Sequence, residues 1–224
     1  MLAVCAAANG QSLASESGFS GLVTLTSEYI YRGQALSDGN PALQAGLDYQ
    51  HSSGWFAGAW ASTVDLRSPF GRRDAELDYY VGYSHAFDAP LAVSATLIRY
   101  TYPGQTGSFD YDHNQWVIAA TLRERLAFEF GYSDDIYGWD RIGRHVEVRA
   151  EQPVASAWVL SGGLGRNDLE SLRAGKYLYW DIGVSARFAR VNVDLRWHDN
   201  ESIDGLLGRL SAGSQVVVGL TASF

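Results

Sequence analysis

The sequence predicts an all-β fold: a single transmembrane, antiparallel, up-and-down β-barrel of twelve strands with both termini periplasmic. Short segments of the chain alternate apolar and polar residues, as strands with one apolar and one polar face do. The connections between these segments alternate between long and short, which is typical of barrels whose loops are long at one end only. The last segment repeats the alternation at Val216, Val218 and Leu220, and the sequence stops on Phe224.

The predicted strands follow one another with few residues between them. They are residues 19–32, 41–51, 55–64, 75–84, 91–102, 112–122, 126–133, 144–151, 156–164, 177–188, 191–198 and 214–224. The short connections are 52–54, 85–90, 123–125, 152–155 and 189–190. The longer ones are 33–40, 65–74, 103–111, 134–143, 165–176 and 199–213. Only odd-numbered connections are long, so all long loops are predicted at one end and all tight turns at the other.

The alternation also assigns the two faces of most strands. It is clearest in 191–198, where odd positions are apolar and even positions are polar. The residues predicted to face lipid are Val23, Leu25, Leu43, Leu47, Leu77, Val81, Trp116, Ile118, Phe128, Phe130, Val146, Val148, Leu160, Trp180, Ile182, Val193 and Leu195. The aromatic residues predicted to lie at the membrane interfaces are Tyr29, Tyr31, Tyr49, Tyr83, Tyr132 and Trp197. Segments 55–64 and 91–102 alternate poorly, and the pattern leaves their inward faces unassigned.

Charged residues recur on the predicted inner face. The candidates to line a pore are Glu28, Arg32, Asp48, Glu76, Asp78, Glu129, Glu147, Arg149, Asp181, Asp194 and Arg196. With Glu151, Arg99 and Arg187 added, this face holds nine acids and five arginines, an excess of four acids (nine minus five). The excess predicts a weak preference for cations. Strands and loops use nearly all residues after Ser15, so no segment is predicted to plug a narrow, water-filled lumen.

Composition excludes several other classes of protein. The formal net charge of −8 argues against nucleic-acid binding, because the phosphate backbone attracts clusters of Lys and Arg. The mean hydropathy of −0.13 and the lack of long apolar runs argue against transmembrane helices. A soluble barrel or sandwich would show the same alternation. It is disfavoured because aromatic residues gather towards strand ends, and because a repeat of about seventeen residues leaves room for membrane-length strands.

The first fourteen residues resemble the end of an export signal. An apolar stretch, 1–8, precedes Ser12-Leu13-Ala14, a small-x-small site that predicts cleavage after Ala14. No basic residue comes before the stretch, so the natural start is expected further upstream. A lipoprotein modified at Cys5 and a disordered tail are the alternatives. The barrel is then expected to span 15–224, without a thiol.

No catalytic or metal-binding motif is present, so neither a cofactor nor a metal is predicted. The five His are scattered, without the His-Glu-x-x-His spacing of zinc hydrolases. Asp134-Asp135 and His198-Asp199 are the only groups suited to a hydrolase at the barrel rim. The glycine-rich stretch 161–165 is predicted to end a strand and not to bind phosphate.

The first half of the chain resembles a known family. The resemblance rests on the runs 21–29, 31–34, 37–38, 41–49, 54–60, 76–83 and 100–104, and it extends to 132–135. These runs are similar to TorF-type porins of proteobacterial outer membranes. The resemblance implies an outer-membrane location and a pore, with no defined substrate.

The C-terminal strand resembles the signal that the outer-membrane assembly machinery reads, with Val216, Val218, Leu220 and Phe224 as the presented residues. A plain hydrophobic edge strand is the alternative. Together these observations predict a passive channel for small hydrophilic solutes or ions, with outer-membrane lipid as its surroundings. A non-conducting structural or adhesive barrel is the second hypothesis, and an outer-membrane hydrolase is the third.

Overall fold

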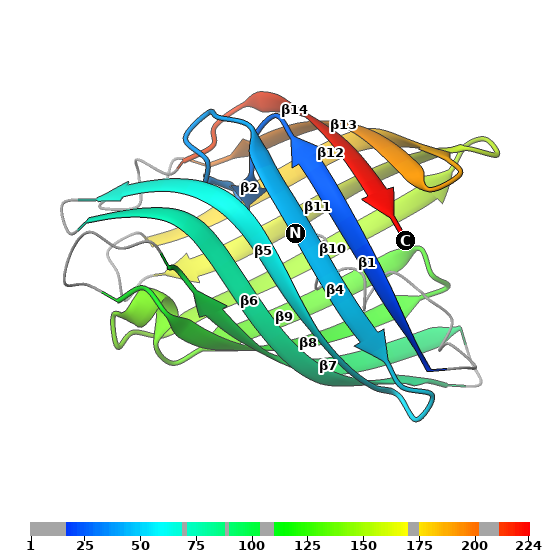
Figure 1. The fold of residues 1–224 in the computed structure, drawn as a ribbon, viewed down its shortest axis with the longest axis horizontal. Helices are drawn as coiled ribbons and strands as arrows, with labels where there is room; N and C mark the ends of the chain where they lie inside the picture. Colours follow the sequence, from blue (N-terminus) through cyan, green and yellow to red (C-terminus); the bar gives the residue numbers. More distant parts are fainter. Residues whose placement is uncertain (1–16, 69–70, 88–89, 104–109, 170–174, 202–210) are drawn as a thin grey trace.

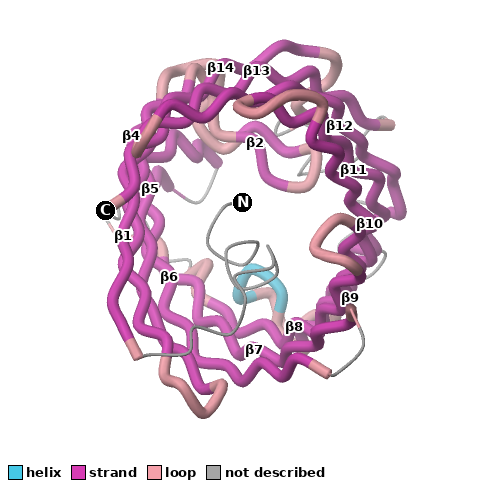
Figure 2. Tube along the Cα trace, turned by 90° about the vertical axis from the view of Figure 1, so that its right-hand side faces the viewer, coloured by secondary structure: helices cyan, strands magenta, loops and turns pink. Residues whose placement is uncertain are grey.

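The chain forms a closed antiparallel barrel of twelve strands, as the sequence predicts (Figures 1 and 2). The computed structural model describes residues 17–68, 71–87, 90–103, 110–169, 175–201 and 211–224. The barrel strands are β1 (Gly18–Thr26), β4 (Ala42–Gln50), β5 (Trp55–Ser68), β6 (Gly71–Ala86), β7 (Leu91–Thr101), β8 (His113–Leu122), β9 (Leu126–Ser133), β10 (Gly143–Pro153), β11 (Trp158–Leu169), β12 (Gly175–Phe188), β13 (Val191–Asn200) and β14 (Gln215–Ser223). The predicted signal peptide, 1–14, lies outside the described residues.

The sheet closes because β1 pairs with β4 on one side and with β14 on the other. Leu22 lies opposite Ser223, so β1 begins and β14 ends at the end of the barrel where the tight turns lie. Each strand pairs with its neighbours in the sequence, and no barrel strand has an open edge. A closed sheet satisfies its backbone hydrogen bonds internally, which a lipid environment requires. Within the described residues, no helix is long and apolar enough to cross a membrane.

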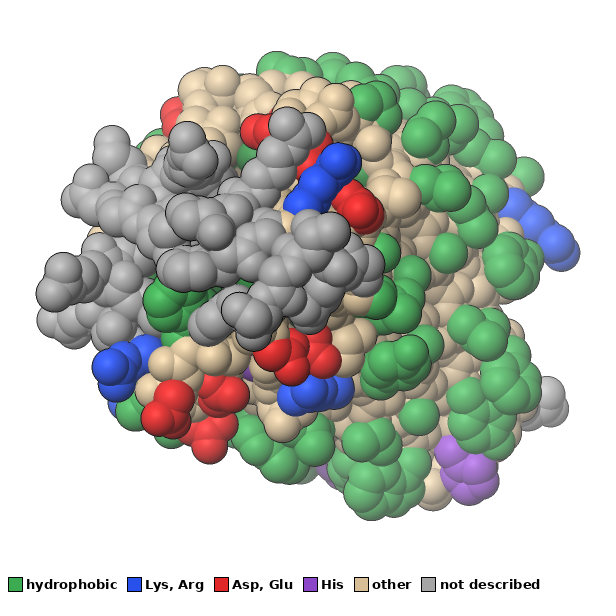
Figure 3. All heavy atoms as spheres, turned by 60° about the vertical axis from the view of Figure 1, so that its left-hand side comes forward, with side chains coloured by type: hydrophobic (Ala, Val, Ile, Leu, Met, Phe, Trp, Pro, Cys, Tyr) green, Lys and Arg blue, Asp and Glu red, His purple; other side chains and the backbone are tan. Residues whose placement is uncertain are grey.

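The outer surface of the barrel is apolar. Every residue predicted to face lipid is exposed except Leu77 and Trp180, which are partly exposed. Neighbouring residues show the alternation directly: Ile118 is 58% exposed and Val117 only 1%. Figure 3 shows hydrophobic side chains spread over one side of the barrel, beside an end where acidic and basic side chains gather. The exposure of these residues confirms that they lie on the outward face of the strands.

The first predicted strand is too long. It ends at Thr26, and the chain then turns into the barrel as the small hairpin of β2 (Ile30–Tyr31) and β3 (Gln34–Ala35), visible inside the ring in Figure 2. Positive φ angles at Arg32 (50°) and Gly33 (76°) form its two-residue turn, a geometry that matches strand twist and favours glycine. The prediction that no segment enters the lumen is therefore wrong.

Three further expectations are corrected. Tyr29 and Tyr31 belong to the inward hairpin and its approach, so they do not lie at a membrane interface. The connections predicted at 65–74 and 165–176 are mostly strand, because the β5–β6 and β11–β12 hairpins continue beyond the expected strand ends. The strands that alternate poorly, β5 and β7, direct aromatic and aliphatic residues inward on one face.

Candidate functional site: the barrel lumen

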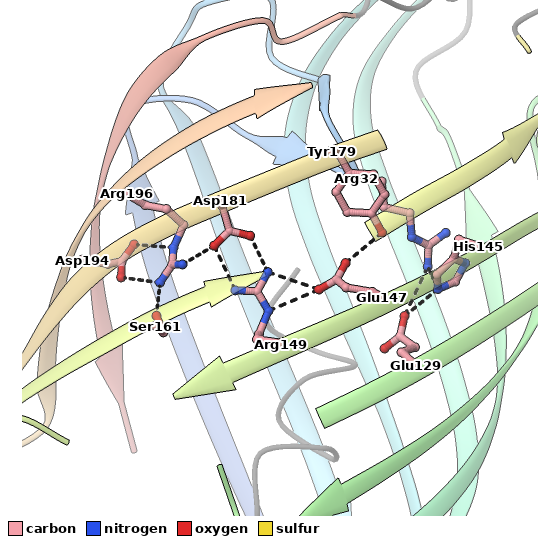
Figure 4. A network of polar contacts seen from close by, with 10 residues as sticks. All are labelled: Arg32, Glu129, His145, Glu147, Arg149, Ser161, Tyr179, Asp181, Asp194 and Arg196. Atoms are coloured by element: carbon pink, nitrogen blue, oxygen red, sulfur yellow. Dashed lines mark hydrogen bonds and ion pairs between the residues drawn. The ribbon is translucent and has the colours of Figure 1, made fainter. Parts of the chain in front are cut away.

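The lumen has two walls of different chemistry. The wall formed by β5 to β8 is lined by aromatic and aliphatic side chains, and we call it the aromatic wall. The wall formed by β9 to β13 carries carboxylates and guanidinium groups, and we call it the charged wall (Figure 4). The inward hairpin lies between them.

The tip of the hairpin is anchored to the charged wall by Arg32. Its guanidinium nitrogen Nη2 lies 3.5 Å from Glu129 Oε1, and it donates to Gln115 Oε1 at 3.2 Å. The same nitrogen lies 2.9 Å from His145 Nε2. The Arg32 guanidinium also stacks over the Tyr31 ring, 4.4 Å from its centre. Side chains from β8, β9 and β10 thus hold one arginine.

His145 Nε2 serves two partners with opposite requirements. It lies 2.7 Å from Glu129 Oε1, which accepts a hydrogen bond, and 2.9 Å from the Arg32 nitrogen, which donates one. A ring nitrogen with a proton satisfies Glu129, and one with a free lone pair satisfies Arg32. Whether Nε2 of His145 carries a proton, in the neutral tautomer or in the charged ring, therefore decides which partner it holds.

Backbone and amide contacts fix the rest of the hairpin. The Tyr177 hydroxyl donates to the Arg32 carbonyl at 3.1 Å and accepts from Gln34 Nε2 at 2.9 Å. The Tyr137 hydroxyl, from the short 3-10 helix Ile136–Gly138, donates to Gln34 Oε1 at 3.3 Å. Burial raises the pKa of Tyr137 above its usual range, so it remains a neutral donor. The Gly33 carbonyl accepts from the Ala212 N–H at 2.9 Å.

Arg149 is the centre of the charged wall. It donates to both Asp181 oxygens, at 3.0 and 2.6 Å, and to Glu147 at 3.2 Å. Glu147 also accepts the Tyr179 hydroxyl at 2.8 Å. Paired, bidentate contacts of this kind compensate the cost of taking charges out of bulk water.

Arg196 continues the network towards the end of the barrel with tight turns. It contacts Asp181 and Asp194, and it donates to the Ser161 hydroxyl at 2.7 Å. Glu147, Arg149 and Asp181 on β10 and β12 are thus joined to Arg196 on β13 in one chain of ion pairs (Figure 4). The alternation within single strands predicts these residues on one face, and only the strand register shows which of them meet.

The aromatic wall is packed against the hairpin. Tyr29 meets Trp60 edge to face, with ring centres 5.4 Å apart, and the Tyr31 hydroxyl lies 3.0 Å from that of Tyr100. Tyr100 in turn stacks on His113 at 4.7 Å. On this wall the packing of rings, and not ion pairing, holds the hairpin.

A cavity of about 560 Å³ lies between the hairpin and the tight turns. Hydroxyl and amide groups of Thr24, Gln44 and Thr221 line one side of it. Arg196 and Asp194 line the other. Most residues that line the cavity are therefore polar or charged, although Ile30, Val159 and Val217 line it too, whereas the outside of the barrel at the same strands is apolar.

The structure places the predicted pore-lining residues as follows. Glu129, Glu147, Arg149, Asp181, Asp194 and Arg196 belong to the charged wall, and Asp48, Glu76 and Asp78 lie with the aromatic wall. Arg32 and Glu28 belong to the inward segment, where Glu28 accepts the Gly39 N–H at 2.8 Å. Glu151 and Arg187 line the cavity. Placing Arg99 on the inner face is wrong: its side chain is 43% exposed, pairs with Asp112 and lies beside the outward Tyr79.

The assembly-signal residues Val216, Val218, Leu220 and Phe224 are all exposed on the outer surface. The Phe224 ring lies over Gly21 of β1, where a side-chain carbon would approach it to 2.5 Å. Sequence reasoning missed His145, Gln115, Trp60 and Tyr100. His145 shares the inward parity of Glu147 and Arg149, so the strand period could have identified it.

The pair His198-Asp199, considered for a rim hydrolase, is separated by the sheet. His198 lines the cavity, and its neighbour Asp199 follows it in the same strand, so their side chains leave the sheet on opposite faces. Within the described part of the chain, no three His, Cys, Asp or Glu residues gather to hold a metal ion.

The closed β-barrel is similar in fold to solved porins and channels. The KdgM porin has a TM-score of 0.57 at 8% identity, with 92% of this chain and 99% of that chain covered. The NanC porin has a TM-score of 0.57 at 10% identity, with coverage of 92% and 99%. The COG4313 outer membrane channel from Pseudomonas putida F1 has a TM-score of 0.54 at 12% identity, with coverage of 96% and 98%. At these identities the similarity concerns the fold.

The chain belongs to the Gcw_chp family, described as bacterial proteins of unknown function, whose model matches residues 10–224. No curated protein matches the sequence. The narrower resemblance to TorF-type porins is untested by these matches and stays a prediction.

Proposed function

We propose that the protein is a narrow outer-membrane channel through which small hydrophilic solutes or ions diffuse passively. The observation that carries this proposal is the pairing of an apolar outer surface with a polar lumen cavity of about 560 Å³. An apolar exterior suits lipid, and a polar interior suits water and solutes. The tight turns and both barrel termini would face the periplasm, and the long loops the exterior.

Transport in this proposal needs no reaction. Fixed polar groups replace part of the water shell of a solute as it passes. Thr24, Gln44 and Thr221 offer hydroxyl and amide groups on one side of the path, and Arg196 with Asp194 offers charges of both signs on the other. The inward hairpin makes the constriction, because Arg32 at its tip reaches the opposite wall.

We expect a weak cation preference. Without Arg99, the charged residues predicted to face inward are nine acids and four arginines, an excess of five acids (nine minus four). The zero-current potential of the refolded protein in a planar bilayer, measured across a potassium chloride gradient, tests this expectation. A potential with the sign of cation preference supports it, and anion preference would refute it.

The constriction has its own test. Arg32→Ala removes the contacts to Glu129, Gln115 and His145, so the hairpin should move more freely and single-channel conductance should rise at least twofold. Arg144→Ala is the matched control, because Arg144 is exposed and stacks over Tyr132 outside the lumen. Equal conductance in both variants would place the constriction elsewhere.

For assembly, we propose that the machinery which inserts outer-membrane barrels recognises Val216, Val218, Leu220 and Phe224. Deleting Phe224 should reduce the heat-modifiable, membrane-inserted fraction in cells severalfold. Replacing Val23, an apolar residue on the outer face of the adjoining strand β1, with Ala is the control. If insertion is unchanged without Phe224, the C-terminal strand is a plain hydrophobic edge strand and not an assembly signal.

A sealed barrel with a structural or adhesive role is the second candidate, and the inward hairpin is the observation that favours it. Swelling of liposomes in isosmotic arabinose separates the two. A channel admits the sugar and the liposomes swell, whereas a sealed barrel does not change their volume.

A further inference from the structure

Two carboxylates stand close together on the aromatic wall. Glu76 and Asp78 lie on the inward face of β6 and are 0% and 8% exposed. They are two residues apart on a strand, so their Cα atoms are roughly 7 Å apart and their side chains leave the same face.

Neither carboxylate has an ion-pair partner among the described residues, although the hydroxyls of Tyr102 and Tyr29 both lie against Glu76. Glu76 Oε1 accepts the Tyr102 hydroxyl at 3.2 Å, but Glu76 Oε2 and Asp78 Oδ1 are buried without a hydrogen-bond partner. No ion pair within the described part of the chain reaches either residue. The charged wall differs, because Glu147 and Asp181 there each pair with an arginine.

Aromatic rings surround the two carboxylates. In the strand register Asp78 lies opposite Trp60 on β5 and Tyr100 on β7. Tyr29, from the segment that leads into the hairpin, packs edge to face on Trp60 at 5.4 Å. All three rings are buried. A cation is attracted to the faces of such rings as well as to carboxylates.

We propose that Glu76 and Asp78, enclosed by Trp60, Tyr100 and Tyr29, form a binding site for the primary ammonium group of an organic solute. An ammonium carries three N–H donors, which suit the two unpartnered oxygens. A calcium or magnesium ion would need six or more oxygen ligands, and the aromatic side chains around this site supply few. The proposal deepens and rests on the proposed function, since a solute would have to enter this site from the lumen cavity, which Tyr29 also lines.

Isothermal titration calorimetry of the refolded full chain tests the site. The chain is held in detergent micelles, so that both ends of the barrel are open to solvent. The probes are ethylammonium chloride, ethanol as a neutral analogue, and potassium chloride at equal ionic strength. We expect saturable binding of ethylammonium only. Affinity should fall at least tenfold in E76Q/D78N and remain unchanged in D134N, which removes an exposed carboxylate from a connection between strands.

Heat modifiability on gels and circular dichroism establish that each variant folds. Trp60→Phe is a second variant that keeps the ring and weakens its attraction for cations, so affinity should fall by a few fold. No saturable binding to the folded parent chain, equal binding of potassium, or full affinity in E76Q/D78N would each overturn the site. If the folded parent chain binds ethylammonium but shows no single-channel conductance, the proposed channel and not the binding site is contradicted.

Discussion

The two walls of the lumen fill a barrel in opposite ways. On the charged wall, Arg149 and Arg196 cross-link carboxylates from several strands. On the aromatic wall, Trp60, Tyr100 and Tyr29 pack by shape and leave Glu76 and Asp78 without ion pairs among the described residues. The difference shows that an inward face of a membrane barrel need not be uniformly polar. One wall can provide a cohesive core against which a segment folds, while the other keeps a polar path.

The largest expected effect on stability comes from the centre of the charged wall. Arg149→Ala leaves Glu147 without its arginine and Asp181 with only Arg196, so the free energy of unfolding should fall by about 4 kcal/mol. Urea unfolding in micelles, followed by tryptophan fluorescence, measures it. Arg187→Ala is the control, because Arg187 is exposed and its loss should cost less than about 1 kcal/mol. Equal losses would mean that the network does not stabilise the wall.

The aromatic wall should respond to truncation by forming a cavity. Trp60→Ala should lower the free energy of unfolding by about 3 kcal/mol, because the ring is buried against Tyr29. Trp116→Ala, at an outward position that is 57% exposed, should cost less, since detergent fills the space.

Salt concentration should affect variants of the two walls differently in the same urea unfolding measurement. Raising sodium chloride from about 0.1 to about 1 M should slightly narrow the loss of unfolding free energy in Arg149→Ala, because salt screens mostly buried ion pairs only weakly. The loss in Trp60→Ala, which removes no charge, should not change. A salt-dependent Trp60→Ala deficit would contradict the division into two walls.

A smaller effect is expected where tyrosine rings cover glycines. A side-chain carbon at Gly165 would overlap the Tyr179 ring on the charged wall, and one at Gly58 would overlap Tyr80 on the aromatic wall. Alanine at either position should cost about 2 kcal/mol by overpacking. Gly46→Ala is the matched control, because its nearest neighbour, Trp60 Cδ1, would lie 3.4 Å away. Similar values at Gly46 and Gly165 would show that backbone flexibility, and not the ring, sets the cost.

The sequence predicts the barrel well because lipid imposes one rule on every strand. Outward positions such as Leu25, Ile118 and Ile182 must be apolar, so the period of two survives wherever the inner face is polar. On β5 and β7 it fades, because inward residues such as Trp60 and Ile98 are apolar as well. Alternation cannot assign the faces of a strand that is apolar on both sides.

The sequence pattern does not predict the inward hairpin, for a related reason. Tyr29 and Tyr31 continue the alternation of β1, so the local pattern favours a longer strand. Tertiary contacts hold this segment inside the barrel. Arg32 contacts Glu129 and Gln115, and Tyr29 packs on Trp60, and these partners are all distant in the sequence. Candidate lumen residues could be assigned to a face by parity, but their partners depend on strand register.

The central claim is that a water-filled path runs between the two walls, and single-channel recording of the refolded full chain in planar bilayers tests it most directly. We predict discrete, reproducible conductance steps in potassium chloride from a preparation whose folding is shown by heat modifiability. A folded, inserted barrel that passes no current above the bare bilayer would contradict the account.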